Sequence, residues 1–199
     1  FINLAAKAHD TLNVTNPSEY YLVNTDLSKS FFDAFLHSNA STFIYFSSVK
    51  AVKDHYAEIL LEDTTPTPHT AYGKSKLNAE KYLLSKIVYT EKRIIVIRPS
   101  MIHGPGNKGN MNLLYQLVAK GLPWPLGAYE NRRSFLSIEN LCFAINELLN
   151  NENVPSGVYN VADDEPLSTN ELIGLIAQSQ NRKPKVWNFS KKFIEGVAS

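Results

Sequence analysis

The sequence predicts an α/β fold built on a parallel sheet. Three apolar runs with the length of buried strands, at residues 1–6, 42–46 and 93–98, alternate with two stretches whose apolar residues recur at helical spacing. Parallel strands need crossover helices, so this alternation indicates repeated strand, helix, strand units. A loop at 104–110, rich in residues that break regular structure, separates this half from a second half of different texture.

The composition is that of a globular protein. The 199 residues are 44% hydrophobic and 20% charged, with a formal net charge of +1, and these interspersed charges give no sign of nucleic-acid binding. No apolar run approaches the roughly 18 residues of a membrane span. The single cysteine excludes an intramolecular disulfide framework, and five scattered histidines predict no metal site. We therefore expect a reducing, cytoplasmic setting.

The elements of the first half follow from local pattern. Residues 1–6 are too short and too evenly apolar for a helix and predict a buried strand. Ser18 is a candidate N-cap for a helix extending to about residue 36. The strand at 42–46 ends in two serines, and residues 53–68 read as a loop with acidic residues and prolines. A helix over about 70–89 then leads to the strand at 93–98.

The second half predicts shorter elements. The loop at 104–110 has three glycines but neither a dinucleotide fingerprint nor a phosphate loop. A helix over 112–120 precedes a stiff apolar segment at 121–127, and Ser137 or Ser134 is expected to cap a helix over 138–149. A short strand at 157–161 follows. Ser168 and Glu171 form a capping-box pattern before a helix over 172–177.

Tyr72 and Lys76 form a candidate proton-handling pair. They lie four residues apart, so on a helix they share one face, and Ser48 ends a strand upstream of this helix. A phenol has an ordinary pKa of about 10, so it acts as a base near neutral pH only where positive charge stabilises the tyrosinate. The Lys76 ammonium and a cationic nicotinamide ring would both do so. The three residues suit oxidation of an alcohol, with Ser48 passing or polarising the substrate's proton.

Two alternatives compete with these assignments. Tyr82 and Lys86 repeat the spacing on the same expected helix, but Tyr82 lies about 15 Å further along its axis. Only one pair can lie near the strand end, and Ser48 favours Tyr72, which leaves Tyr82 as a surface or packing residue. Ser47 is the nearest alternative to Ser48.

A set of short motifs occurs in a specific order along the chain. They are Asn3-Leu4-Ala5-Ala6, Val23-Asn24-Thr25, Phe46-Ser47-Ser48, Tyr72-Gly73-Lys74-Ser75-Lys76, Ile97-Arg98-Pro99-Ser100, Gly104-Pro105-Gly106 and Arg133-Ser134-Phe135-Leu136. The ordered set resembles the extended short-chain dehydrogenases/reductases, specifically the NAD-dependent nucleotide-sugar epimerase/dehydratase family typified by UDP-glucose 4-epimerase. Ser47-Ser48-Val49-Lys50 looks most like members that serve bacterial surface-polysaccharide pathways. The resemblance covers nearly the whole chain and implies a Rossmann-type fold.

The resemblance implies roles for individual residues. Tyr72 would be the base, Lys76 would hold the nicotinamide ribose and acidify Tyr72, and Ser48 would bond the reacting sugar hydroxyl. The other cofactor-binding residues would be Leu4, Ala5, Ala6, Asn24 and Pro99. The other substrate-binding residues would be Asn110 and Arg133 for the diphosphate, with Arg132 as competitor, and Trp124 and Leu126 for the uracil. A guanidinium suits a diphosphate because its fork pairs with two oxygens at once.

The resemblance also implies an organisation of the chain. Residues 1–103 would be the second half of an NAD-binding Rossmann domain. Residues 104–199 would be mainly a substrate-binding region with segments returning to the core. The family's glycine-rich turn and its acidic ribose-binding residue would precede Phe1, so we expect an internal piece of a longer protein. NAD is the expected cofactor, with NADP left open. A homodimer through helices containing 18–36 and 78–89 is one expected assembly.

Three functions remain open on these residues. The first is NAD-dependent epimerisation at C4 of a UDP-sugar through a transient 4-keto intermediate. The second is an NAD(P)H-dependent reductase of a 4-keto-6-deoxy nucleotide sugar, and the third is a non-catalytic cofactor-binding relative or an inert fragment. Dehydration is disfavoured because Val49-Lys50 stands where 4,6-dehydratases have Asp-Glu. Met101 and His103 replace an Asn and a Tyr that are frequent in epimerases, which weakens assignment to galactose epimerisation itself.

Overall fold

The chain folds as two compact units. The computed structural model describes residues 1–8, 16–55, 59–106 and 110–190. The first unit contains Phe1–Ser100 and Leu141–Val161, and the second contains Met101–Asn140 and Ala162–Ser199. The chain thus enters the second unit at Met101, returns to the first, and leaves it again. The roles expected for residues 1–103 and 104–199 stay predictions.

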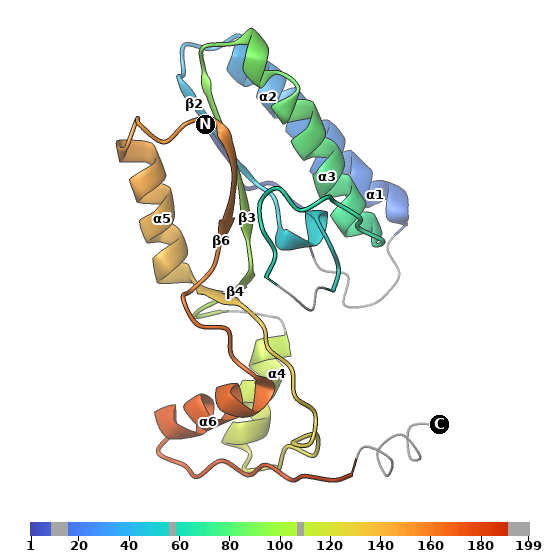
Figure 1. Ribbon diagram of the computed structural model, residues 1–199, viewed down its shortest axis with the longest axis vertical. Coiled ribbons are helices and arrows are strands. Elements are labelled where there is room, and N and C mark those ends of the chain that lie inside the picture. The colour runs from blue at the N-terminus through green and yellow to red at the C-terminus, as the bar shows by residue number, and fades with distance from the viewer. Residues whose placement is uncertain (9–15, 56–58, 107–109, 191–199) are drawn as a thin grey trace. The chain divides into compact units, whose positions relative to one another are not determined.

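The first unit is built on a four-stranded parallel sheet (Figure 1). Its strands are β1 (Ile2–Asn3), β2 (Thr42–Phe46), β3 (Arg93–Pro99) and β6 (Gly157–Val161), in the spatial order β1, β2, β3, β6. Strand β2 pairs with β3 from Thr42 opposite Arg93 to Phe46 opposite Ile97. The predicted parallel α/β fold is confirmed. All four strands end at one edge, where sheets of this kind bind ligands.

The strands at 42–46, 93–98 and 157–161 are confirmed, whereas the strand predicted over 1–6 is wrong in extent. Strand β1 ends at Asn3 because the side chain of Asn3 redirects the backbone. Its Oδ1 accepts a hydrogen bond from Ala5 N at 3.0 Å, and its Nδ2 donates to Ser28 Oγ at 3.1 Å. When an asparagine side chain hydrogen-bonds the backbone two residues further on, the chain forms a turn and stops pairing with the neighbouring strand.

Helices lie on both sides of this sheet (Figure 1). Helix α1 (Pro17–Tyr21), the π-helical segment η1 (Leu22–Leu27) and α2 (Ser28–Leu36) run on without a break. Together with α3 (Ala71–Leu84) they cover one face, and α5 (Ile138–Asn150) lies on the other side. The predicted N-cap Ser18 is wrong, because Asn16 Oδ1 accepts the Ser18 N–H at 3.1 Å. Helix α3 ends before residue 89, and the turn η3 (Ile87–Tyr89) follows it.

An aromatic core fixes α3 against the sheet. Its buried members are Phe32 and Phe35 of α2, Phe43 and Tyr45 of β2, Ala79 and Leu83 of α3, and Ile94 and Val96 of β3. The rings of Phe32 and Phe43 meet edge to face, with centroids 5.1 Å apart. Alternate residues of each strand and residues four apart on α3 supply this face. The core therefore holds α3 rigidly above β2.

The second unit contains two helices and a pair of very short strands. Strands β4 (Met101–His103) and β5 (Phe135–Ser137) are parallel, and their three-residue length explains why the sequence pattern missed them. Helix α4 (Asn110–Ala119) packs on α6 (Thr169–Ser179). The predicted capping box of Ser168 and Glu171 is confirmed. Ser137 Oγ accepts the Asn140 N–H at 3.1 Å, so Ser137 caps α5.

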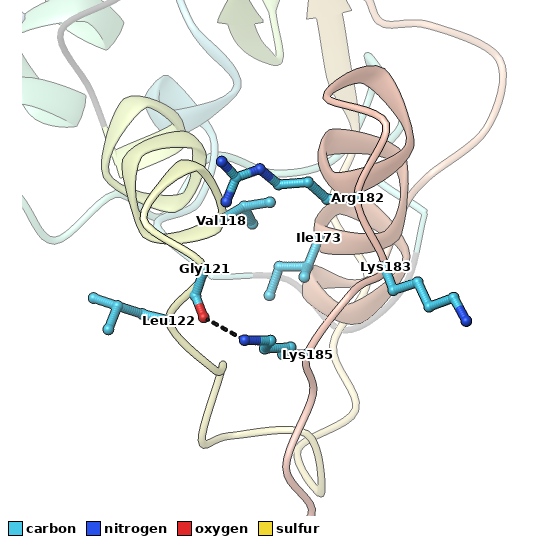
Figure 2. Close-up of a pocket in the computed structure, with 7 residues that line it drawn as sticks. All are labelled: Val118, Gly121, Leu122, Ile173, Arg182, Lys183 and Lys185. Carbon is cyan, nitrogen blue, oxygen red and sulfur yellow. Dashed lines mark hydrogen bonds between the residues drawn. The ribbon is translucent and has the colours of Figure 1, made fainter.

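A hollow of about 260 Å³ lies where α4 ends (Figure 2). Its lining residues are Val118, Gly121, Leu122, Ile173, Arg182, Lys183 and Lys185. Gly121 has a φ of +68°, and its carbonyl accepts a hydrogen bond from Lys185 Nζ at 3.1 Å. Cations near a helix C-terminus offset its negative dipole end. Lys185 therefore caps the end of α4, and none of the predicted site residues lines the hollow.

The described ranges contain neither a membrane-spanning helix nor a cluster of metal ligands. Within them no helix combines the length and apolar character needed to cross a membrane. In the same residues, no three His, Cys, Asp or Glu side chains gather in a way that could hold a metal ion.

Candidate active site

Ser48 lies at the carboxyl end of β2, where the chain turns into the short helix η2 (Val49–Ala51). Its backbone is extended, with φ −164° and ψ 151°, and its Oγ accepts the Lys50 N–H at 3.2 Å. The Ser48 side chain also interacts with the phenol of Tyr72 and lowers the pKa of that phenol. The structure therefore brings these two predicted residues together across the gap between strand end and helix.

Tyr72 lies in the first turn of α3, half-buried beside the strand end. Thr70 caps this helix, and Asp54 holds the cap by accepting the Thr70 hydroxyl at 2.7 Å and the His69 N–H at 2.7 Å. Burial raises the pKa of Tyr72, the Ser48 hydrogen bond lowers it, and Tyr20 raises it. The net shift is upward, which differs from the expectation that Lys76 lowers this pKa.

Burial of the phenol is the main cause of this upward shift, and the Lys76 ammonium is bonded elsewhere. The side chain is 1% exposed, and Nζ donates to the Phe46 carbonyl at 2.7 Å and lies 5.0 Å from the centre of the Tyr45 ring. Burial lowers the pKa of Lys76 from 10.5 to about 8, and the Glu80 carboxylate partly offsets the shift. A buried ammonium thus lies one turn beyond Tyr72, held by the end of β2.

We expect the buried Lys76 to make stability depend on pH. Between its folded pKa of about 8 and its ordinary value of 10.5, the unfolded chain binds a proton that the native chain does not. The free energy of unfolding therefore rises with pH across this interval, by about 3 kcal/mol in total. Lys76→Met should remove this rise. The free energy of unfolding of the variant should exceed that of the original protein most at pH 7, where the buried lysine is charged.

The measurement is urea unfolding from pH 7 to 10.5 of the whole protein that carries this chain, without cofactor. Lys74→Met is the matched control, since Lys74 is an exposed lysine of the same helix and should keep the rise. Equal pH slopes for the original chain and Lys76→Met would contradict the prediction.

Tyr82, from the second Tyr–Lys pair of the same spacing, packs against helix α2. Tyr82 donates its hydroxyl to Asp33 Oδ1 of α2 at 2.8 Å, and its ring packs on Phe32. The Lys86 ammonium lies 5.4 Å from the centre of the Tyr82 ring. Tyr82 therefore joins α3 to α2 and does not contact the strand end.

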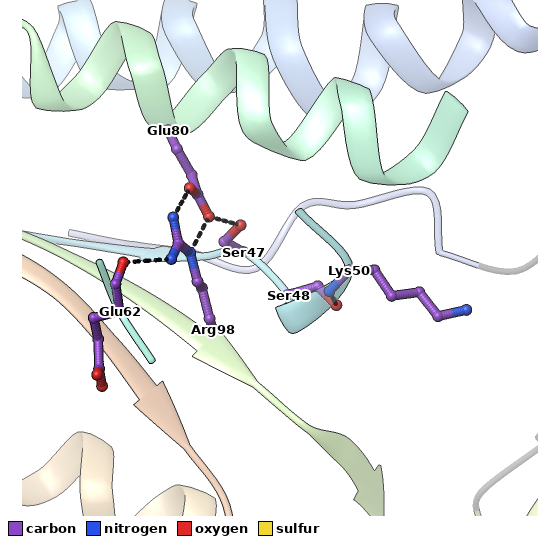
Figure 3. A network of polar contacts seen from close by, with 6 residues as sticks. All are labelled: Ser47, Ser48, Lys50, Glu62, Glu80 and Arg98. Atoms are coloured by element: carbon purple, nitrogen blue, oxygen red, sulfur yellow. Dashed lines mark hydrogen bonds and ion pairs between the residues drawn. The ribbon is translucent and has the colours of Figure 1, made fainter. Parts of the chain in front are cut away.

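Ser47 is held in a buried polar network that the sequence analysis missed (Figure 3). Its Oγ donates to Glu80 Oε1, and Arg98 of β3 donates to both Glu80 oxygens, at 3.0 and 2.6 Å. These bonds occupy Ser47, which leaves Ser48 as the hydroxyl beside Tyr72. Two sequence signals could have found the network. Arg98 is a charged residue in an otherwise apolar strand, and Glu80 lies four residues after Lys76 on α3.

Asn24 is fully buried in the π-helical segment and joins three elements. Its amide accepts the Lys7 N–H at 2.8 Å and donates to the Lys7 carbonyl at 3.0 Å. It also donates to Ser75 Oγ of α3 at 3.0 Å. π-Helical turns are frequent at functional sites. Here the turn allows Asn24 to bind both the loop after β1 and the helix of Tyr72.

The remaining predicted cofactor-binding residues of the first unit lie at the carboxyl ends of β1 and β3. Leu4 is 66% exposed after β1, Ala5 is half-buried and Ala6 is exposed. Pro99 is buried as the last residue of β3, and the next residue, Ser100, has a buried Oγ with no hydrogen-bond partner among the described residues. These residues and the serine–tyrosine–lysine group belong to the same edge of one sheet.

The predicted substrate-binding residues other than Ser48 all lie in the second unit. Arg133 is exposed, and its guanidinium makes no hydrogen bond to the part of the chain that the structure describes. Its neighbour Arg132 instead contacts Glu171 at 3.8 Å and the Pro166 carbonyl at 3.3 Å. Asn110 begins α4, but its side chain lies outside the described part.

Trp124 and Leu126 form isolated bridges with Val186 and Asn188. Trp124 packs against the core of the second unit, and its indole Nε1 is buried without a hydrogen-bond partner in the described ranges. An indole N–H that lacks a partner is available to an added acceptor.

Comparison with known proteins supplies relatives for this arrangement. The chain is 31% identical over 182 residues to the UDP-glucose 4-epimerase of Vibrio cholerae, covering 88% of this chain and 55% of that protein. It is 32% identical over 184 residues to an N-acetyl-alpha-D-glucosaminyl-diphospho-ditrans,octacis-undecaprenol 4-epimerase of Escherichia coli O157:H7, covering 90% and 54%. It is 30% identical over 149 residues to a GDP-6-deoxy-D-mannose reductase of Pseudomonas aeruginosa, covering 69% and 48%. The chain thus spans about half the length of these relatives.

Solved structures agree with the fold. The protein MoeE5, in complex with UDP-glucose and NAD, superposes with a TM-score of 0.77 at 22% identity, covering 94% of this chain and 64% of that one. This likeness confirms the predicted Rossmann-type α/β fold. The model of the NAD dependent epimerase/dehydratase family matches residues 1–162. A match over most of the chain, together with these relatives, shows that the chain belongs to the NAD dependent epimerase/dehydratase family.

Proposed function

We propose that the whole protein carrying this chain is an NAD-dependent epimerase that acts at C4 of a UDP-sugar through a transient 4-keto sugar. The observation that carries the proposal is the meeting of two groups at the end of β2: the Ser48 side chain, which interacts with the Tyr72 phenol, and the buried Lys76 ammonium, which lies one turn further along α3. Two of the relatives named above are 4-epimerases, which supports C4 as the reacting carbon. The undecaprenol-linked substrate of one relative supports a role in making surface-polysaccharide precursors.

The described residues fit a nicotinamide cofactor. Ala5 leaves space after β1, and the unpartnered Ser100 Oγ beside Pro99 can serve a polar group laid along the sheet edge. The buried Lys76 ammonium can donate to a ribose hydroxyl on leaving the Phe46 carbonyl. When bound, the cofactor accepts a hydride from the sugar and returns it. We propose NAD, and NADP remains the alternative.

The proton moves through this chain's own side chains. Tyr72, as tyrosinate, takes the proton of the C4 hydroxyl through or beside Ser48 while the C4–H bond gives up its hydride. The 4-keto sugar then rotates in the site, receives the hydride on its other face and takes the proton back from Tyr72. Burial raises the pKa of Tyr72 in this structure, so its ionisation needs the Ser48 hydrogen bond and positive charge from Lys76 and the oxidised ring. Nothing is consumed over the cycle.

The second unit would hold the nucleotide. Arg133 suits the diphosphate, because its guanidinium has no bond to the described residues and can pair with two phosphate oxygens. Asn110 is proposed to contact the same group from the start of α4. Trp124 and Leu126 are proposed to pack on the uracil. A homodimer through the helices containing 18–36 and 78–89, and a cytoplasmic location, stay predictions.

We expect Gly73→Ala to lower turnover by displacing Tyr72. A Cβ at Gly73 would lie 2.4 Å from the Lys50 carbonyl and 2.9 Å from Pro68 Cβ, so α3 would have to move away from η2. Displacing a reacting group by about 1 Å can cost 100-fold, and we expect kcat to fall about 10- to 100-fold. Steady-state kinetics measures this.

The control for this prediction is Gly174→Ala. Gly174 also lies within a helix, but a Cβ there would meet nothing within 4 Å, so kcat should not change. An unchanged kcat in Gly73→Ala would show that the close approach of α3 to η2 does not place Tyr72.

A reductase is the second candidate, because one relative is a GDP-6-deoxy-D-mannose reductase. Such an enzyme would reduce a 4-keto-6-deoxy nucleotide sugar with NAD(P)H and use the same three residues once, with Tyr72 giving its proton to the new hydroxyl. The two functions differ in cofactor balance. An epimerase recycles its NAD, whereas a reductase consumes one NAD(P)H for each sugar.

The deciding experiment incubates the whole protein with NAD and no added reductant. The substrates are UDP-glucose, UDP-N-acetylglucosamine and their galacto partners, and sugar interconversion is followed by NMR. Interconversion that disappears in Tyr72→Phe supports the epimerase and identifies its sugar. Oxidation of NAD(P)H only by a 4-keto sugar would replace the epimerase with the reductase. No turnover in either assay would overturn both and leave a non-catalytic relative.

A further inference from the structure

A buried ion pair lies beneath the end of β2 (Figure 3). The Arg98 guanidinium and the Glu80 carboxylate meet through two hydrogen bonds, and their side chains are 4% and 1% exposed. The Ser47 hydroxyl donates to the same carboxylate, on Oε1. One carboxylate of α3 therefore binds a side chain from each of two neighbouring strands.

The same guanidinium also holds the loop that follows η2. Arg98 Nη1 donates to the Glu62 carbonyl at 3.2 Å. On the next strand, the Asn160 N–H donates to Glu62 Oε1 and its Nδ2 donates to the Leu60 carbonyl, both at 2.9 Å. Arg98 thus joins α3 to this loop, and through the shared carboxylate to the end of β2, without solvent access.

The position of Ser47 determines where Ser48 points. Successive side chains of an extended strand lie on opposite sides, so a Ser47 directed at Glu80 directs Ser48 away from it. Ser47 is also held through its backbone, whose N–H donates to the Ile97 carbonyl at 2.8 Å. Glu80 and Tyr72 lie on one rigid helix, about 12 Å apart along its axis. The network therefore fixes the strand end against the helix that carries the phenol.

We propose that Ser47, Glu80 and Arg98 are positioning residues, which hold the Ser48 hydroxyl against the Tyr72 phenol without touching the sugar or the cofactor. Stability alone does not account for three buried polar side chains, because well-packed apolar residues of similar size often fill such a site with equal or greater stability. The inference rests on the proposed function, in which Ser48 and Tyr72 are the reacting groups.

The first test is Ser47→Ala in the whole protein, which removes one hydroxyl and leaves both Arg98 bonds to Glu80. We expect kcat to fall about 10- to 100-fold with the KM for the nucleotide sugar unchanged, because only the geometry of proton transfer is altered. The ascending limb of the kcat–pH profile should move to higher pH, since a weakened Ser48 bond leaves the pKa of Tyr72 higher. A change confined to folding would not move this limb.

A double-mutant cycle then separates action through Ser48 from independent action. If Ser47 works through Ser48, adding Ser47→Ala to Ser48→Ala should lower kcat little further. Tyr82→Phe is the control, because it also removes a hydrogen bond of α3, to Asp33, and should leave kcat unchanged. Thermal unfolding of each variant confirms that it is folded. An unchanged kcat in Ser47→Ala, or a full additional loss in the Ser48→Ala background, would overturn the proposal.

A readout without turnover keeps this test separate from the proposed function. The Tyr72 phenol is titrated by 13C NMR of the tyrosine-labelled protein, with its resonance assigned by Tyr72→Phe. We expect the pKa of Tyr72 to be higher in Ser47→Ala than in the original protein. If the original protein turns over none of the sugars, the proposed function fails, and an unchanged Tyr72 pKa in Ser47→Ala would still overturn the positioning role.

Discussion

Replacing Tyr72 with phenylalanine is expected to lower kcat for sugar interconversion about 1,000-fold, with KM little changed. In the proposed mechanism the Tyr72 phenol, beside Ser48 at the start of α3, takes the proton, and general bases contribute about 10²- to 10⁴-fold. Phenylalanine fills the same space beside the Tyr20 ring, 6.3 Å away between centroids, so the fold should persist. Steady-state kinetics together with thermal unfolding measures both effects.

Tyr82→Phe provides the comparison for this loss. It removes a hydroxyl from the second pair of the same spacing, whose hydrogen bond goes to Asp33, and kcat should stay within about twofold of the original on the usual scale for distant sites. If Tyr72→Phe retained full activity, the base would have to be sought elsewhere and the proposed function would lose its main support.

Breaking the buried pair of Glu80 and Arg98 on one side only is expected to cost stability heavily. Arg98→Met leaves the Glu80 carboxylate buried without the guanidinium that binds both of its oxygens, and Glu80→Leu leaves the guanidinium without its carboxylate. Each single variant should lose about 3 to 5 kcal/mol of unfolding free energy, a large share of a typical domain's total. Combining both changes with Ser47→Ala removes all three buried polar groups and should restore most of the loss. Urea unfolding at pH 7 is the measurement.

An exposed ion pair supplies the control. Lys7 and Glu19 meet at 2.6 Å with side chains 27% and 53% exposed, so Glu19→Gln should cost less than about 1 kcal/mol. If Arg98→Met or Glu80→Leu lost no more unfolding free energy than Glu19→Gln, water would have to reach the charge that is left. A triple variant as unstable as the singles would show that the pair contributes stability that apolar packing cannot replace.

Local pattern predicted the elements well where the signal lies within a few neighbouring residues. The strand at 42–46 and the capping box of Ser168 were predicted with their bounds, because a short apolar run and a helix cap are both local signals. The strand at 1–6 failed after Asn3, since a side-chain hydrogen bond to Ser28, 25 residues away, accompanies the turn of the backbone. Strands β4 and β5 depend on pairing between residues 101 and 135, which no local window contains.

The candidate site divides in the same way. The sequence by itself determined the chemistry offered, because the order of its motifs and the four-residue spacing of Tyr72 and Lys76 place a phenol and an ammonium on one helix face. Only the tertiary structure distinguished Ser47 from Ser48, because it directs the Ser47 hydroxyl to Glu80 and brings the Ser48 side chain to Tyr72. It also reversed the expected pKa shift of Tyr72, because the phenol is buried and Lys76 Nζ binds the Phe46 carbonyl. The physical reason is that burial and long-range hydrogen bonds depend on which elements meet, whereas spacing along one helix does not.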